Sequence, residues 1–137
     1  SRGLGDVYKR QIDDYAHHPD EIRASINSVK ALYPGRKVTV AFQPHLYSRT
    51  RDFAPEFAEA LSLADEVILL DIYPAREEPI EGVTSKIIFD RLTVGDKEMI
   101  IKQDLIKTIK NRNFEILLTV GAGDICNYLP EIVRAVK

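Results

Sequence analysis

Short, nearly continuous apolar runs alternate with longer stretches of helical spacing, and this alternation constrains the fold most. The runs at 38–42, 67–70 and 116–120 are rich in β-branched residues. Such runs are typical of strands buried on both faces, as in parallel sheets. Between them, apolar residues recur every three or four positions, as from Ile22 to Leu32. We therefore expect an α/β fold, an open and mostly parallel sheet with helices on both faces.

The rest of the chain continues the same alternation. Further helical stripes begin at Phe53, Ile87, Leu105 and Ile125, and Met99 to Ile101 is expected to form a short edge strand. A strand, a helix and a second parallel strand are joined by a right-handed crossover in nearly all known cases. The order of elements therefore predicts a sheet built from such crossovers.

The first eleven residues show neither period. They mix glycine and charged residues, and a strand becomes recognisable only toward Ile12–Tyr15. We interpret residues 1–11 as an irregular lead-in or a non-native segment. The total of 137 residues suits a single domain, which we place at 12–137.

Composition excludes several classes of protein. Nineteen basic and 21 acidic residues give a net charge of −2, whereas a nonspecific nucleic-acid binder needs a positive field. The longest apolar run, Val67 to Leu70, is too short to cross a bilayer. The lone cysteine, Cys126, permits neither an internal disulfide nor a cysteine-based zinc site. We expect a cytoplasmic protein that binds neither nucleic acid nor membrane.

The near-neutral total conceals a local asymmetry of charge. The segment from Ile22 to Arg51 carries six bases and no acid, and the segment from Asp52 to Glu81 carries nine acids and one base. Most of these side chains are expected to be solvated. Arg49 and Arg51, however, follow an apolar run and neighbour a histidine, and such a group can form an anion pocket.

Polar clusters follow the expected strands. They lie at 13–20, 43–52, 71–82 and 121–124. Ligands of open α/β sheets bind at the carboxyl ends of strands, which meet at one edge. We therefore expect the polar chemistry of this chain to converge there.

The cluster Asp13–Pro19 contains two carboxylates, a phenol and two imidazoles. Such groups can bind a metal, but no His-x-x-x-His or cysteine pair supports one, so we expect no protein-built metal site. They can also contact a nucleotide, or simply cap a helix. We favour capping for Asp13, and ligand contact for Asp14, Tyr15 and His17 together.

The segment from Phe42 to Asp52 is more informative. Pro44 ends the strand by removing a backbone donor, and the following turn is expected to present His45 and Arg49 close together, with a tyrosine and a serine between them. Arg49 could bind a carboxylate or phosphate bidentately, or it could form a surface salt bridge. The charge pattern favours neither role over the other.

Other features carry less chemistry. The long loop 71–82 is of a kind that is often functional, and the glycines at 121–123 fit a tight strand-to-helix turn. We interpret Cys126 as a core residue. The chain contains no Gly-x-x-x-x-Gly-Lys-[Ser/Thr] loop, so it lacks the usual means of activating a nucleoside triphosphate.

Three motifs together carry a resemblance. They are Asp-Asp-Tyr-Ala-His-His-Pro at 13–19, Phe-Gln-Pro-His at 42–45, and Asp-Ile-Tyr-Pro-Ala at 71–75 with Glu-x-Pro-Ile at 77–80. From about Ile12 to its end, the chain resembles the Rossmann-like C-terminal domain of the Mur ligases of bacterial peptidoglycan synthesis. The second motif favours the branch of the family that joins L-alanine to UDP-N-acetylmuramate.

The resemblance implies a role within a three-domain enzyme. One domain binds the UDP-sugar, a central domain binds ATP and Mg²⁺, and the C-terminal domain closes over the site. ATP phosphorylates the muramoyl carboxylate, and the amine of alanine then attacks the acyl phosphate. Both upstream domains lie outside this sequence, which on this interpretation contains no catalytic residue and contributes positioning and charge neutralisation.

The resemblance also implies roles for individual residues. Arg49 would hold the carboxylate of alanine, and Asp14 would face the nucleotide, with the ribose as its expected partner. The implied substrate-binding residues are Tyr15, His17, His45, Arg49 and Arg51, and the implied nucleotide-binding residues are Asp14 and His18.

Two positions depart from the family pattern. Many members have arginine where this chain has Leu46, and glycine where it has Arg76. The first departure removes one carboxylate-binding charge, and the second affects the conformation of the loop. We expect the isolated 137 residues to be catalytically silent.

Three alternatives remain. A sister ligase attaches a recycled tripeptide to the same UDP-sugar and shares the first motif, though not Phe-Gln-Pro-His. A free-standing module that binds an anionic small molecule belongs to a different class. A metal-dependent phosphohydrolase built on His17 and His18 is the third, and it would require tightly bound metal.

Overall fold

The computed structural model describes residues 10–14, 18–112, 114–121 and 125. Five parallel strands form one sheet in the order β1-β5-β2-β3-β4. The strands are β1 (Arg10–Asp14), β2 (Val38–Phe42), β3 (Glu66–Leu69), β4 (Asp96–Met99) and β5 (Ile116–Val120). The helices are α1 (Pro19–Leu32), α2 (Tyr47–Leu61), α3 (Lys86–Phe89), the 3₁₀ turn η1 (Lys102–Asp104) and α4 (Leu105–Asn111). The expected α/β fold is confirmed.

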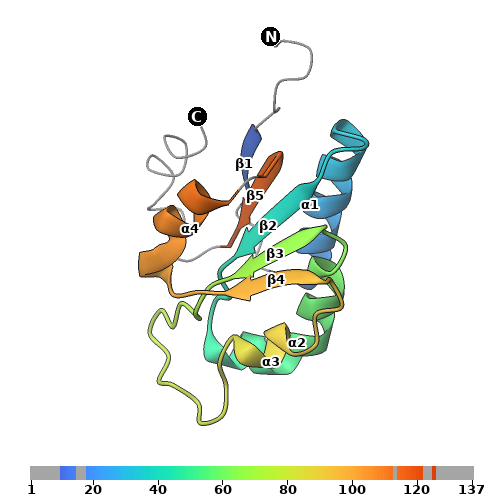
Figure 1. Ribbon diagram of the computed structural model, residues 1–137. Coiled ribbons are helices and arrows are strands. Elements are labelled where there is room, and N and C mark those ends of the chain that lie inside the picture. Colours follow the sequence, from blue (N-terminus) through green and yellow to red (C-terminus); the bar gives the residue numbers. More distant parts are fainter. Residues whose placement is uncertain (1–9, 15–17, 113, 122–124, 126–137) are drawn as a thin grey trace.

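The sheet lies between α4 on one face and α1, α2 and α3 on the other (Figure 1). It separates two hydrophobic clusters. Alternate residues of a strand point to opposite faces, so Val40 and Phe42 pack beneath α1, α2 and α3 while Ala41 faces α4. The three central strands are buried along their whole length, as their continuous apolar runs predict.

The edge strands differ from the sequence expectation in their limits. β4 lies at 96–99 rather than 99–101. An edge strand pairs with β3 on one side only and leaves its residues partly exposed, so the charged residues Asp96 to Glu98 can form it without an apolar run. Directly after it, Ile100 still donates its N–H to the Leu69 carbonyl at 2.9 Å. The Ile100 side chain packs against the cluster on the α4 face (the α4-face cluster), whose buried residues are Ala41, Ile68, Leu70, Leu105, Ile109, Phe114, Leu117 and Ile125. β1 begins at Arg10, so Arg10 and Gln11 belong to the sheet and not to a lead-in.

Two expected helices also differ. The stripe at Ile87 forms only the single turn of α3, and Leu92 is buried just beyond it. Of the stripe that starts at Ile125, only Ile125 lies among the described residues, and it is buried in the α4-face cluster. The stripe at Leu105 forms α4 as expected.

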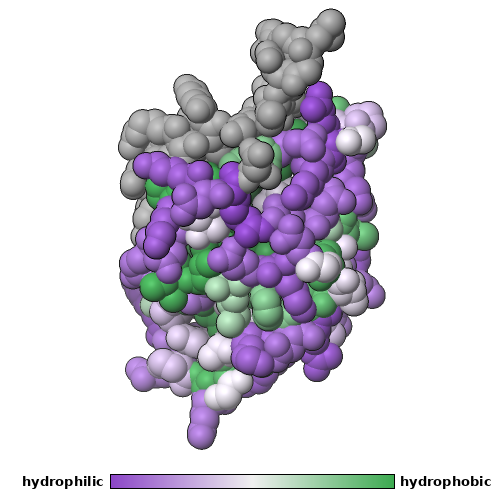
Figure 2. Space-filling view, viewed as in Figure 1, coloured by the Kyte–Doolittle hydropathy of each residue, from purple (hydrophilic) through white to green (hydrophobic). Residues whose placement is uncertain are grey.

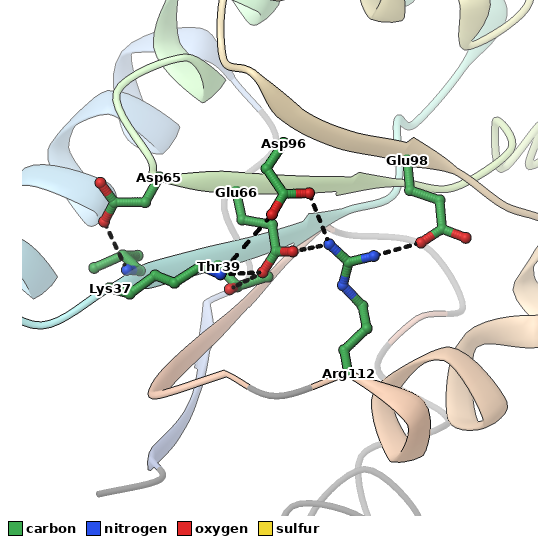
Figure 3. A network of polar contacts seen from close by, with 8 residues as sticks. Lys37, Thr39, Asp65, Glu66, Asp96, Glu98 and Arg112 are labelled. Carbon is green, nitrogen blue, oxygen red and sulfur yellow. Dashed lines mark hydrogen bonds and ion pairs between the residues drawn. The ribbon is translucent and has the colours of Figure 1, made fainter. Parts of the chain in front are cut away.

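A network of charged side chains closes the amino edge of the sheet (Figure 3). Glu66 begins β3, is only 3% exposed, and accepts a 2.7 Å hydrogen bond from the Thr39 hydroxyl. Arg112, directly after α4, contacts Glu66 and also pairs with Asp96 at 3.0 Å and Glu98 at 2.6 Å. Burial lowers the pKa of Arg112. This network fixes the end of α4 to the β3–β4 edge, opposite the edge where ligands are expected.

Candidate functional site

The polar segments predicted to converge do follow neighbouring parallel strands. Asp14, Val120 and Phe42 lie in register across β1, β5 and β2. Adjacent strands are about 4.8 Å apart, so the ends of β1 and β2 are separated by about 10 Å. The ends of β1 and β2, where the first two motifs lie in the sequence, are therefore on either side of the end of β5.

Gln43 and Gly121 hold this junction together. Gln43 is 1% exposed, its backbone N–H donates to the Val120 carbonyl at 3.1 Å, and its Oε1 accepts a hydrogen bond from the Ile125 N–H at 2.8 Å. Gly121 has φ +146°, and a Cβ there would lie 2.9 Å from the Gln43 carbonyl oxygen. Gln43 is not among the residues predicted for the site, although an amide between Phe42 and Pro44 is a signal of a buried hydrogen-bonding residue.

His45 is held by the long loop after β3. It forms a parallel bridge with Tyr73, and the two rings stack with centroids 5.7 Å apart and planes 15° apart. The Leu46 N–H donates to the Tyr73 carbonyl at 2.8 Å, and the Tyr73 N–H donates to the Pro44 carbonyl at 2.8 Å. Two segments far apart in sequence thus meet where β2 and β3 end.

Arg49 lies on a helix and not in a turn. α2 begins at Tyr47, earlier than the stripe at Phe53 predicts, and the polar residues 47–52 form its first turns. His45 lies just before the helix, and the Arg49 side chain in the first turn reaches back to it. Arg49 Nη1 lies 3.5 Å from His45 Nδ1, a long contact in which only the guanidinium can donate.

Arg51 does not join this pair. It is exposed, and its Nε donates to Asp52 at 2.9 Å, which raises the pKa of Arg51. Residues two apart on a helix point in different directions, and this separates Arg51 from Arg49. Arg49, in contrast, forms no ion pair with any residue that the structure describes.

His18 is the N-cap of α1. Its Nδ1 accepts a hydrogen bond from the Asp20 N–H at 3.2 Å, and the Glu21 carboxylate accepts one from the His18 N–H at 3.1 Å. The sequence signal for this reciprocal capping was Glu21, three residues after the cap and within the first turn. The ring of His18 also lies 5.5 Å from that of Phe53, which sets the start of α1 beside α2. Tyr15 and His17 lie outside the described residues.

Glu77 is a site residue that sequence reasoning missed. From the loop 71–82 it accepts hydrogen bonds from the backbone N–H groups of Tyr47 and Ser48 and from the Ser48 hydroxyl. The hydrogen bond from that hydroxyl is the main reason that the pKa of Glu77 is lowered, and the two backbone donors and Arg51 add to the effect. No local sequence signal joins residues 30 positions apart.

A pocket of about 570 Å³ lies beside this site, past the ends of β3 and β4. Its lining includes Tyr47, Asp71, Ile72 and Ser85 together with the apolar residues 99–101. Figure 2 shows hydrophobic residues gathered over the segment that joins β4 to α4, on a face that is mostly hydrophilic, and Met99 and Ile101 of this segment are exposed.

The described residues offer no metal cage. Among them, no three histidine, cysteine or carboxylate side chains are grouped closely enough to hold an ion. In the same part of the chain, every helix is too short or too polar to span a bilayer. What the arrangement can do chemically is to present, at the carboxyl edge, a guanidinium that an imidazole holds in place, a donor suited to a carboxylate.

Comparison with known proteins identifies the family. Residues 6–124 match the model of the Mur ligase, glutamate ligase domain. The chain belongs to this family. The UDP-N-acetylmuramate–L-alanine ligase of Parabacteroides distasonis is 63% identical over 114 residues, which are 83% of this chain and 25% of that protein. The ligase of the same name from Phocaeicola vulgatus is 57% identical over 122 residues, 88% of this chain and 27% of that protein.

Solved structures of the Mur ligase family share this fold. The UDP-N-acetylmuramate-alanine ligase of Thermotoga maritima matches with a TM-score of 0.73 at 32% identity, covering 98% of this chain and 28% of that chain. A domain from Haemophilus ducreyi, crystallised by itself, matches with a TM-score of 0.67 at 19% identity and covers 98% of both chains. This chain spans about a quarter of the length of the curated relatives it matches.

Proposed function

We propose that this Mur ligase domain is the C-terminal part of a ligase that joins L-alanine to UDP-N-acetylmuramate at the expense of ATP. The pairing of Arg49 with His45 at the start of α2 carries the proposal. It provides donors for a carboxylate at the sheet edge where open α/β folds bind ligands. Relatives named for that reaction are 57% and 63% identical to this chain.

In the proposed role, Arg49 binds the carboxylate of alanine and leaves its amine free to attack. The planar guanidinium binds both oxygens of the carboxylate, and its contact with His45 Nδ1 helps to hold it in place. Neutralising the carboxylate brings the amine close to an acyl phosphate without repulsion between the two anions. The contribution of this chain is thus positioning and electrostatic, and the phosphoryl transfer belongs to another domain.

The remaining assignments are parts of the same proposal. Asp14 ends β1 in register with the end of β5, a position suited to a ribose hydroxyl, and Nε2 of His18 is the ring nitrogen assigned to a nucleotide, since Nδ1 accepts the Asp20 N–H. Tyr15 and His17 are assigned to the substrate and Arg51 to the periphery of the site. The Mg²⁺ that accompanies ATP is assigned to the central domain, and the enzyme to the cytoplasm.

A grafted enzyme tests the proposal. This chain would replace the matching C-terminal segment of the Parabacteroides distasonis ligase, and ADP release would be measured with UDP-N-acetylmuramate and either L-alanine or a tripeptide. We expect activity with alanine, and an alanine KM that rises about tenfold or more in Arg49→Met because a charge-assisted hydrogen bond is lost. The matched control is Arg91→Met, since Arg91 is exposed near the far end of α2.

Two results would contradict the proposal. One is a preference of the grafted enzyme for the tripeptide, which would favour the sister recycling ligase. The other is an alanine KM that is the same in Arg49→Met as in the parent. The isolated 137 residues are expected to release no ADP with alanine present, and alanine-dependent ATP hydrolysis by them would show that the other domains are not required.

A further inference from the structure

Helix α2 begins without a cap of its own. Its N-cap is Leu46, an apolar residue with φ +73° and no side chain able to accept a hydrogen bond, and its first turn holds no acidic residue. The first N–H groups of a helix have no partner within the helix, and they carry a partial positive charge. The turn that carries Arg49 therefore depends on a partner from elsewhere.

Glu77 is that partner. Its carboxylate accepts hydrogen bonds from the N–H groups of Tyr47 and Ser48, the latter at 3.1 Å, and from the Ser48 hydroxyl. Three donors on one carboxylate define the direction in which the first turn of α2 faces. The low pKa of Glu77 is consistent with a carboxylate that remains ionised in this position.

The loop 71–82 also fixes His45, which directly precedes the N-cap residue Leu46. Tyr73 exchanges backbone hydrogen bonds with Pro44 and Leu46 and stacks on the ring of His45. His45 thus rests on one part of the loop, and the helical turn that carries Arg49 is tied to another. The position of His45 relative to Arg49 is therefore set by the conformation of the loop 71–82.

We propose that Glu77 is a positioning residue, which sets the orientation of Arg49 relative to His45 and thereby the geometry of carboxylate binding. This inference rests on the proposed function, because it assigns a purpose to the Arg49–His45 pair. Glu77 itself contacts no substrate. It acts through the first turn of α2, and replacing it should weaken the binding of alanine without changing the binding of ATP.

The opposite role for Glu77 is an internal competitor that occupies an anion site at the helix start. The two roles predict opposite changes in the alanine KM of a Glu77 variant. Loss of a positioning carboxylate raises the alanine KM, whereas loss of a competitor lowers it. The alanine KM of a Glu77 variant therefore decides between them.

The experiment uses the grafted ligase and the variants Glu77→Gln and Glu78→Gln. Both changes remove one negative charge from the same loop, but Glu78 is exposed and makes none of the described hydrogen bonds. We expect Glu77→Gln to raise the alanine KM about tenfold and to change the KM for ATP less than twofold. Glu78→Gln should leave both constants within twofold of the parent.

A double-mutant cycle tests whether Glu77 acts through Arg49. In a variant that already carries Arg49→Met, the Glu77→Gln change should have little further effect on the alanine KM, because effects that share a route are not additive. Additive effects would overturn the inference, as would an unchanged or lowered alanine KM in Glu77→Gln alone. If Arg49→Met has no effect by itself, the proposed function fails first, and the inference fails with it.

A readout that does not depend on activity supports the same comparison. In amide NMR spectra of the 137-residue chain, the signals of Tyr47, Ser48 and Arg49 should shift in Glu77→Gln and not in Glu78→Gln. The signals of α4 should stay in place in both variants. Unchanged signals at the start of α2 would overturn the inference whatever the kinetics.

Discussion

Single residues with no catalytic role determine whether the ligand edge can form. Gly121 allows the turn after β5 to pass close to the Gln43 carbonyl, in a region of φ that side chains disfavour. Gln43 in turn uses its buried amide to hold the Ile125 N–H. Both residues lie near the ends of β5 and β2, between Asp14 and His45 along the sheet edge. A substitution that moves either residue would therefore displace Asp14 and His45 relative to each other.

We predict that Gly121→Ala destabilises the chain by about 1–3 kcal/mol, since a Cβ would be forced against a backbone oxygen and into an unfavourable φ. Urea unfolding followed by circular dichroism measures the change. The matched control is Gly95→Ala, where a Cβ meets nothing within 4 Å. Equal unfolding free energies for the two variants would contradict the prediction.

The pH dependence of stability provides a test of the Glu77 contact. Because the pKa of Glu77 is lower in the folded chain, the unfolded chain binds more protons as pH falls below about 4.5. The stability that this carboxylate contributes is therefore present above its ordinary pKa, and it is lost as pH falls through its folded-state pKa. The parent should be more stable than Glu77→Gln near neutral pH, and the difference should narrow in acid.

Urea unfolding of both proteins from pH 7 to pH 3 measures this narrowing. Ser48→Ala removes the main cause of the pKa shift, so in that background the narrowing should be smaller. A stability difference that stays constant with pH would show that the carboxylate is not held as described.

The helices of the chain differ in whether nearby or distant residues fix where they begin and end. α1 carries its own start signal, with His18 as cap, Pro19 at the first position and Glu21 completing the capping box. α2 has no such signal, and Phe53 within it departs from helical geometry just before Pro55. α4 is short, and the contacts of Arg112 with the sheet secure its end.

Removing Arg112 is predicted to cost about 2–3 kcal/mol in the free energy of unfolding. In Arg112→Met, the nearly buried Glu66 keeps only the hydrogen bond from Thr39 and an ion pair with Lys37 at 3.6 Å. These two contacts do not compensate the buried carboxylate as fully as the guanidinium does. Lys86→Met is the control, because the exposed Lys86–Asp90 pair on α3 should contribute less than about 1 kcal/mol. Equal effects in thermal or urea unfolding would show that the network adds little to stability.

The molecule as a whole is a sheet with a separate hydrophobic cluster on each face. Phe57 of α2 is 1% exposed in one cluster, and Leu105 of α4 is fully buried in the other. The strands between the clusters are shared, so the two faces should unfold together.

We predict that Phe57→Ala and Leu105→Ala each destabilise the whole chain, by about 3–5 and 2–5 kcal/mol. Tyrosine fluorescence and circular dichroism should give one coincident urea transition for each variant. Leu32→Ala is the control, since Leu32 is 70% exposed. Two separate transitions in Leu105→Ala would show that the α4 face unfolds independently.

Local periodicity was enough to predict much of the architecture. The apolar runs at 38–42, 67–70 and 116–120 correspond to β2, β3 and β5, because burial on both faces of a sheet requires such runs. Parallel strands then bring the segments that follow them to one edge, and for this reason the order of strands and motifs along the chain is enough to predict that the motifs gather there.

What the sequence alone determined is therefore the class of fold, the family and the edge at which its polar residues gather. Only the tertiary structure decided that α2 starts at Tyr47, that Arg49 meets His45 while Arg51 does not, and that Glu77 caps the helix from 30 residues away. The physical reason is one of range. Burial patterns repeat every two to four residues, so they can be read directly from the sequence. A hydrogen bond between distant segments depends instead on where the loops and crossovers place those segments in space.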